Sequence, residues 1–254
     1  MRLLLGCGLM LLTASSPLAA DVLIVADEFP AMQVLARQMK TLEGFDSRIV
    51  AQTNLPSDLT PFSAVVVYIH GHLRAAAEKA FISYTEAGGK LVALHHSVSS
   101  GKKTNENWFG FLGVDLPKKT VEQGGYKWIE GVTLEIVKRA DHFITTNRVA
   151  YPNRLAYAPS AGPDAPAESP GFTLHETEVY LNHVLTRPRT VLLGFKYLDA
   201  KTGQTWMQDR AGWLMPAGRG WIFYFMPGHS ARDFENKSYA RLVLNALVFQ
   251  PGKP

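Results

Sequence analysis

The chain has almost no cysteine, since the only one among its 254 residues is Cys7. Because Cys7 lies in an N-terminal segment that we expect to be removed, the mature protein would contain no thiol. This absence excludes disulfides, a thiolate nucleophile and a cysteine-ligated metal. Charged residues are also few, at 19 %, and the lysines and arginines form no basic run of the kind that nucleic-acid-binding proteins carry. We therefore expect no nucleic-acid partner.

Long apolar runs are missing beyond the N-terminus, so we predict no stable membrane span. The N-terminus itself is typical of a signal peptide over residues 1–20. An apolar segment from Leu3 to Leu12 is too short to cross a bilayer, and small residues follow it up to Ala20. Cleavage near Ala20 predicts a periplasmic or secreted protein. Lipidation of Cys7 is the alternative, although almost no apolar segment precedes that cysteine.

Hydrophobic residues make up 46 % of the chain, enough for one large core, and we predict a single domain over residues 21–250. In the first half, apolar strands alternate with amphipathic helices, which indicates an α/β fold with a parallel sheet and right-handed crossovers. Residues 117–210 hold shorter strand candidates and predict antiparallel strands or a lid at the sheet edge. We expect a surface loop over 158–171, a strand at 220–226, and a final helix capped by Asn236.

The histidines are placed unusually, because five of the eight directly follow a predicted strand. They are His70, His72, His95, His96 and His229. In an open parallel sheet, ligands bind outside the carboxyl ends of the strands, so three separate strands would deliver imidazoles to one rim. Imidazole titrates near neutral pH and is a common metal ligand, which indicates an active site. The alternative for any one of them is a cap on strand-end carbonyls or on a helix N-terminus.

Carboxylates accompany these imidazoles in the second half of the chain. In a strand, Glu176, Glu178 and Tyr180 would share one face. A carboxylate near several imidazoles suits either a zinc-type site or general acid–base chemistry, and the alternative is a solvated strand face. Asp141 and His142 form another adjacent pair, for which the alternative is a helix or strand start capped by Asp141. The five tryptophans offer flat faces for sugar rings, although most tryptophans belong to the core.

Several of these segments, in this order, resemble the ThuA-like family, which is named for trehalose utilisation. The resemblance covers nearly all of Asp21 to Gln250. It rests on Gly88-Gly89-Lys90-Leu91-Val92-Ala93-Leu94-His95, Trp108, His142-Phe143-Ile144-Thr145, Glu178-Val179-Tyr180, Trp213, and the segment from Gly218 to His229. Two departures stand out. The first strand is followed by Asp27-Glu28-Phe29 where relatives often carry a Gly-Gly-His-like turn, and Phe143 replaces a proline.

The resemblance implies a flavodoxin-like or class I glutamine amidotransferase-like three-layer sandwich, with a mostly parallel sheet and antiparallel elaborations in the second half. It also implies carbohydrate metabolism, with a sugar, glycoside or 3-keto sugar as the small-molecule partner. A base acting next to a ketone could drive elimination or isomerisation. The amidotransferase relatives use a cysteine, which this chain would lack. No nucleotide cofactor is expected, and the reaction type and oligomeric state stay open.

The predicted site residues follow from the histidine positions and from the resemblance together. The predicted catalytic residues are His95, Glu178, His229, His96 and Tyr180. The predicted substrate-binding residues are Trp108, His142 and Trp213. A divalent metal, Zn or Mn, would be held by His95, His229 and Glu178.

Two other functions are compatible with the sequence. A serine hydrolase would use Ser97 as nucleophile, His229 as base and Asp199 or Asp209 as orienter, with His70-Gly71 as an oxyanion loop. However, a nucleophile elbow has glycines two residues before and after the serine, and Ser97 has none there. A non-catalytic domain that binds a carbohydrate or a partner is the other alternative.

Overall fold

The computed structural model describes residues 22–158, 167–250 and 252. A ten-stranded sheet forms its centre. One half of this sheet consists of β1 (Val22–Ala26), β2 (Ser47–Val50), β3 (Ala64–Tyr68), β4 (Lys90–Leu94) and β12 (Gly220–Phe225). The other half consists of β6 (Lys127–Lys138), β7 (Asn153–Tyr157), β8 (Ala167–Leu181), β10 (Thr190–Leu198) and β11 (Thr205–Ala217). Two short strands, β5 (Val114–Asp115) and β9 (Val184–Leu185), pair separately.

The strand order is β2-β1-β3-β4-β12-β11-β10-β6-β8-β7. Neighbours pair in parallel from β2 to β12 and antiparallel from β12 to β7. The helices are α1 (Phe29–Glu43), α2 (Ala75–Glu86), α3 (Trp108–Leu112), α4 (Phe143–Thr146), α5 (Ala231–Glu235) and α6 (Lys237–Val248). Short 3-10 turns lie at Gln52–Asn54, His95–Val98, Ser100–Lys102 and Val121–Gln123.

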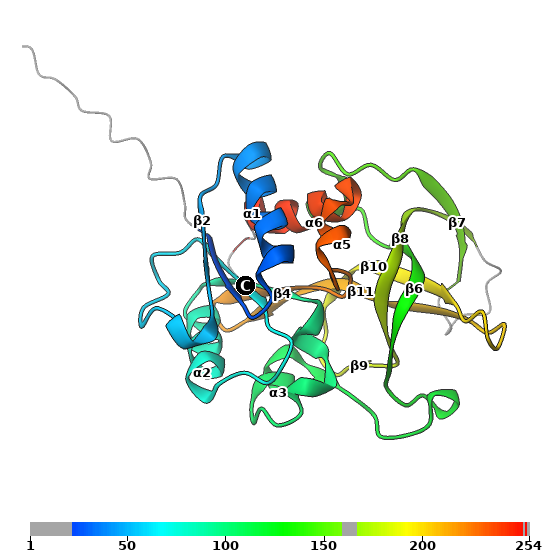
Figure 1. Cartoon of the computed structure of the whole chain (residues 1–254), viewed down its shortest axis with the longest axis horizontal. Coiled ribbons are helices and arrows are strands. Elements are labelled where there is room, and N and C mark those ends of the chain that lie inside the picture. The colour runs from blue at the N-terminus through cyan, green and yellow to red at the C-terminus, as the bar shows by residue number, and fades with distance from the viewer. Residues whose placement is uncertain (1–21, 159–166, 251, 253–254) are drawn as a thin grey trace, which may run out of the picture.

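The layers confirm the predicted three-layer α/β sandwich. Helices α1, α5 and α6 cover one face of the sheet, and α2 and α3 cover the other (Figure 1). All residues of β1, β3 and β4 are buried, as expected for parallel strands that are covered on both faces. The prediction that Asn236 caps the last helix is also confirmed, because its side chain accepts hydrogen bonds from the backbone of Ser238 and Tyr239.

Part of the predicted loop over 158–171 is a strand. Strand β8 begins at Ala167, and Ala167 to Gly171 pair with β7. The small and polar residues of this segment do not predict a strand, because the strand depends on backbone pairing with β7 and not on apolar side chains. Residues 159–166 lie outside the described part of the chain, as does the predicted signal peptide at 1–20. Among the described helices, none combines the length and the apolar character needed to cross a membrane.

The core holds one titratable imidazole, His183, that no sequence pattern had singled out as a site residue. It lies just after β8, is fully buried, and its ring centroid is 6.4 Å from that of Tyr224. Burial lowers the pKa of His183 to about 3, and the nearby charge of Arg210 adds to this effect. In the unfolded chain the same imidazole would titrate near 6.5. The unfolded state therefore binds more protons between these two values.

We predict that this difference makes the protein lose stability as the pH falls below about 6.5. Between pH 7 and pH 4, the free energy of unfolding of the wild type should fall by on the order of 3 kcal/mol more than that of His183→Gln. Urea unfolding at pH 7, 5.5 and 4 would measure this. Identical pH dependences of the two proteins would contradict the prediction.

Candidate active site

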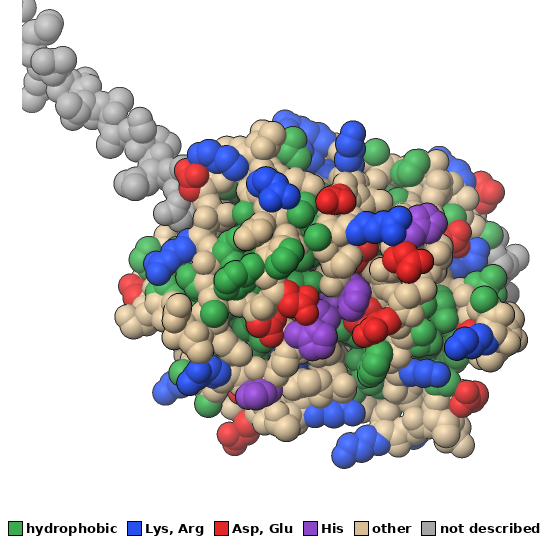
Figure 2. Space-filling view, in the orientation of Figure 1, with side chains coloured by type: hydrophobic (Ala, Val, Ile, Leu, Met, Phe, Trp, Pro, Cys, Tyr) green, Lys and Arg blue, Asp and Glu red, His purple; other side chains and the backbone are tan. Residues whose placement is uncertain are grey.

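The strand-end histidines meet at one edge of the sheet, as the sequence predicts. His70 follows β3, His95 and His96 follow β4, and His229 follows β12. Ring centroids are 4.4 Å apart for His95 and His96, 5.3 Å for His95 and His229, and 4.2 Å for His70 and His96. His72 is exposed, and its backbone carbonyl accepts a hydrogen bond from the side chain of Gln52. Figure 2 shows histidine and acidic side chains gathered on this face.

The carboxylate of Glu178 reaches this edge from the antiparallel half of the sheet. Its Oε2 lies 2.7 Å from Nε2 of His95 and 3.3 Å from Nδ1 of His229. Only 4 % of Glu178 is exposed. Glu178 therefore lies between two imidazoles that come from two different parallel strands.

Two β-bulges aim Glu178 and Tyr180 at the histidines. Glu176 has a φ of +54° and Gly131, on the paired strand β6, has a φ of +67°. The pairing register between β6 and β8 shifts before and after Val132, because each of the two strands contains an inserted residue there. This corrects the prediction that Glu176 shares a face with Glu178 and Tyr180. Glu176 is exposed, whereas the other two are buried.

The hydrogen bonds of His95 fix the orientation of its ring. Its Nδ1 bonds the carbonyl of Met226, and its Nε2 faces the carboxylate of Glu178. Burial alone would raise the pKa of Glu178, but the hydrogen bonds and charges of His229 and His95 outweigh it and lower this pKa to about 2. The hydrogen bond with Glu178 in turn raises the pKa of His229, against its partial burial.

His96 differs from its two neighbours. Its Nδ1 lies 3.1 Å from the hydroxyl of Tyr180, which is also 3.3 Å from Nε2 of His95. Burial first, and the nearby His95 second, lower the pKa of His96, so this imidazole is neutral. Its Nε2 is buried and has no hydrogen-bond partner among the described residues.

Backbone-binding side chains, which sequence analysis missed, hold the strand ends in place. The Nζ of Lys102 is buried and donates to the carbonyls of Ile69, His70 and His96, at 2.6, 3.1 and 3.0 Å. Asp233 accepts from the backbone N–H of His229, 2.8 Å away. No sequence motif indicates a role for Lys102. The role of Asp233 could be inferred only from its place as an acidic residue in the first turn of a helix that follows a glycine.

A cavity of about 260 Å³ opens over this cluster. Its described lining includes His96 from the parallel half of the sheet, and Glu178, Tyr180, Trp128 and Glu130 from the paired strands β8 and β6. Trp128 is 50 % exposed, so it offers a flat face at the cavity. Trp128 therefore presents an aromatic ring to this cavity.

The tryptophans predicted to bind substrate lie elsewhere. Trp108 and Trp213 are both fully buried. The indole of Trp108 donates to the carbonyl of Ser97, and Arg189 covers the ring of Trp213 at 4.2 Å. Because neither ring has a free face, these positions correct the prediction that they stack on a ligand.

His142 has a structural role at the start of α4. Its Nδ1 accepts from the backbone N–H of Ile144 at the start of α4, and its ring contacts Phe249. No contact within the described residues joins it to the histidine cluster. The predicted substrate-binding role of His142 is therefore corrected to a helix cap.

The alternative serine hydrolase triad does not assemble. Ser97 is buried, and its hydroxyl lies 3.5 Å from the carbonyl of Val67. Asp209 pairs with Tyr157 and Arg139 instead of orienting a histidine. Asp199 is in the turn between β10 and β11, where it accepts from the backbone of Lys201.

The sequence model of the family described as "Trehalose utilisation" matches residues 24–250. The chain belongs to the ThuA family. A solved ThuA-like protein from Bacteroides uniformis ATCC 8492 is similar over 94 % of each chain, with a TM-score of 0.60 and 16 % identity. No curated protein matches the sequence.

Two other solved structures are also similar to this chain. A β-galactosidase from Rahnella sp. R3 is similar over 90 % of this chain and 30 % of its own, with a TM-score of 0.52 and 10 % identity. A glutamine amidotransferase from Thermotoga maritima is similar over 91 % of this chain and 96 % of its own, with a TM-score of 0.42 and 9 % identity.

The predicted metal ligands of this ThuA family member have a suitable donor set. Glu178 Oε2 contacts ring nitrogens of both His95 and His229, and one ligand atom each of His95, His96 and His229 lie within 4.8 Å of one another. The bond from Nδ1 of His95 to a backbone carbonyl is the orientation that presents Nε2 to a metal. These residues therefore fit a divalent metal such as zinc.

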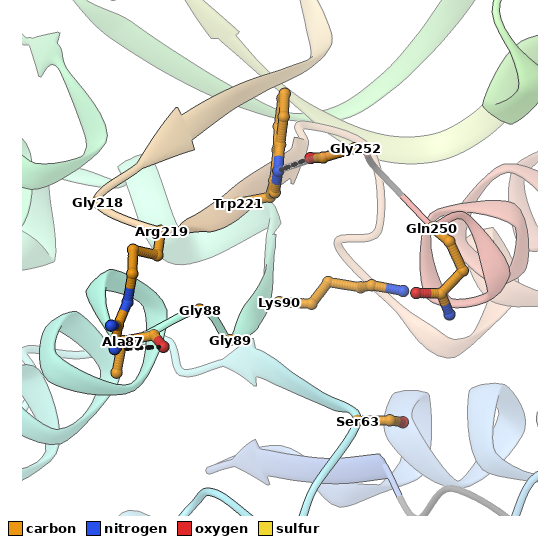
Figure 3. Close-up of a pocket in the computed structure, with 10 residues that line it drawn as sticks. All are labelled: Ser63, Ala87, Gly88, Gly89, Lys90, Gly218, Arg219, Trp221, Gln250 and Gly252. Carbon is orange, nitrogen blue, oxygen red and sulfur yellow. Dashed lines mark hydrogen bonds between the residues drawn. The ribbon is translucent and has the colours of Figure 1, made fainter. Parts of the chain in front are cut away.

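Another cavity, of about 590 Å³, lies at the opposite edge of the parallel strands, where β4 and β12 begin (Figure 3). Its described lining contains no histidine and no carboxylate. Lys90 donates to the carbonyls of Leu247 and Phe249 and so caps the end of α6. This cavity lacks the acid–base groups that the histidine edge has.

We predict that Lys102→Met destabilises the protein by about 3 kcal/mol, because three carbonyls at the ends of β3 and β4 lose a charged donor. The matched control is Lys103→Met, since Lys103 is exposed. Chemical unfolding at neutral pH would measure both. Equal stability of the two variants would show that Lys102 does not hold the strand ends.

Proposed function

We propose that this ThuA family protein is an enzyme that acts on a glycoside or a 3-keto sugar by acid–base chemistry. The observation that carries the proposal is the Glu178 carboxylate, held between His95 and His229 beneath a cavity. The family's description, trehalose utilisation, supports a carbohydrate as substrate. A buried carboxylate with a strongly shifted pKa in a cleft is typical of a functional site.

The cavity favours an uncharged sugar. Its described lining includes Glu130 and Glu178 and no lysine or arginine, so phosphorylated ligands and nucleotides would be repelled. The exposed ring of Trp128 supplies a stacking face for a pyranose. Carboxylates can accept hydrogen bonds from sugar hydroxyls.

The proposed reaction is an elimination from a 3-keto glycoside. The ketone acidifies the neighbouring C2–H, and Glu178 takes this proton to give an enolate across C2 and C3. The ketone then re-forms and the C1–C2 double bond forms as the bond between C1 and the glycosidic oxygen breaks, and His229 donates a proton to the leaving oxygen. The products are an unsaturated keto sugar and an alcohol. Because His229 Nδ1 lies 3.3 Å from Glu178 Oε2, the proton on Glu178 can return to His229 and reset the site.

His95 has a supporting role in this scheme. Its two-sided hydrogen bonding to Met226 and Glu178 fixes the carboxylate and keeps it ionised. If a divalent metal binds at His95, His229 and Glu178, it would supply Lewis-acid polarisation of the substrate ketone.

We also propose that the protein works in the periplasm or outside the cell. The support is the sequence pattern of residues 1–20, together with the finding that none of the described helices could span a membrane.

We predict that the untagged mature chain releases the aglycone from a 3-keto glycoside and that Glu178→Gln lowers kcat by about 100-fold to 10,000-fold. Glu176→Gln is the matched control, because Glu176 is exposed on the same strand. His229→Asn should barely affect a nitrophenyl glycoside, whose leaving group needs no protonation. It should strongly slow the same reaction with an alkyl leaving group. Release of the aglycone, followed over time, measures all four proteins.

One outcome would overturn the enzyme proposal. If the folded wild type binds sugars by calorimetry but converts neither 3-keto nor ordinary glycosides, the protein is a binding domain. In that case Trp128→Ala should weaken binding more than Glu178→Gln, since the stacking face would then carry the affinity.

A further inference from the structure

We propose a second site for a divalent transition-metal ion, formed by Glu28, His70 and His96 beside the Glu178 cluster. The three residues follow three neighbouring parallel strands, β1, β3 and β4. One ligand atom of each lies within 4.8 Å of the other two. Nδ1 of His70 is 3.3 Å from Oε1 of Glu28. The proposed reaction at Glu178 uses none of these three residues.

The first argument is the unpartnered nitrogen of His96. His96 is 1 % exposed, and within the part of the chain that the structure describes its buried Nε2 has no hydrogen-bond partner. A buried polar atom without a partner costs free energy, so native structures seldom leave one. The other ring nitrogen bonds the hydroxyl of Tyr180, which fixes the ring orientation. Metal-ligating imidazoles typically have this pairing, with one nitrogen bonded to the protein and the other free for the ion.

The second argument is that the other two ligands stand on two loops that are joined to each other. The carboxylate of Asp27, on the loop after β1, accepts from the backbone N–H of His70, on the loop after β3, at 2.8 Å. Lys102 also donates to the His70 carbonyl at 3.1 Å. Glu28 and His70 are therefore held next to each other by bonds from residues that would not touch the ion.

The third argument is access. The side chains of Glu28 and His70 are about half exposed, and His70 and His96 line the 260 Å³ cavity that also contains Glu178 and Tyr180. Three protein ligands with an open side are typical of catalytic rather than structural metal sites. Two imidazoles and one carboxylate suit zinc, manganese or iron(II) better than calcium or magnesium, which prefer oxygen ligands.

The carboxylates of this edge also supply the charge that a cation needs. Asp27 and Glu28 lie on the loop after β1, and the buried Nζ of Lys102 donates to the carbonyls of Ile69, His70 and His96 instead of pairing with these carboxylates. An ion at Glu28, His70 and His96 would thus face the cavity, where it could bind a sugar hydroxyl or ketone oxygen.

The test is zinc binding by calorimetry to the untagged mature chain, with cobalt(II) absorption as a second report of imidazole ligands. We expect His70→Ala and Glu28→Gln each to weaken binding at this site by at least about 10-fold. His72→Ala is the matched control, because His72 is an exposed histidine two residues along the same loop. It should bind as the wild type does. Circular dichroism would confirm folding, and the exposure of Glu28 and His70 favours tolerance of both changes.

Three outcomes would overturn this site. They are a folded wild type that binds no zinc, wild-type binding by both His70→Ala and Glu28→Gln, and loss of all bound zinc in Glu178→Gln. The last result would place the ion at the Glu178 cluster and leave the proposed function standing. Conversely, an inactive Glu178→Gln that keeps its zinc, together with weakened binding by His70→Ala, would establish the second site independently of the reaction.

Discussion

The contact between Glu178 and His95 joins the two halves of the molecule. His95 directly follows a parallel strand, β4, and Glu178 lies on an antiparallel strand, β8, that is five places away in the sheet order. Burying a carboxylate is costly, and a single hydrogen bond would not offset that cost. Two imidazoles do so here, and they also hold the carboxylate ionised. The antiparallel half therefore completes the site, because the parallel strands alone supply imidazoles but no buried carboxylate.

The backbone at this contact is unusual as well. His95 has a φ of +31°, a conformation that residues other than glycine rarely adopt. Its carbonyl accepts from the hydroxyl of Tyr224, and its ring bonds the carbonyl of Met226. Tyr224 and Met226 come from β12 and the residue after it, so the neighbouring strand holds His95 in place. Surrounding bonds hold a strained backbone of this kind at sites where the direction of a side chain matters, and here the imidazole points at Glu178.

The sequence predicted the parts of this site that follow from periodicity and topology. Carboxyl ends of parallel strands share an edge, so His70, His95, His96 and His229 had to meet once the strands were recognised. The bulge at Glu176 was not predictable, because an inserted residue changes the face of a strand without changing its composition. Lys102 was missed for a related reason, since its partners are backbone carbonyls that no side-chain pattern reveals. Trp108 and His142 matched family motifs in order, but motif order cannot distinguish a packing residue from a ligand-binding one.

The charges around the cavity limit which ligands can enter it. Glu178 has two imidazoles beside it, whereas Glu130 and Glu28 are exposed and have no such pair of imidazoles. An anionic ligand would add charge of the same sign. The hydroxyls of a neutral polyol can replace water and donate hydrogen bonds to these carboxylates. A cation can lie between Glu28 and the unpartnered nitrogen of His96. The same distribution of charge therefore favours both an uncharged sugar and a metal ion. The two can share one cavity, because the sugar would bond the carboxylates whereas the ion would bind the nitrogen of His96.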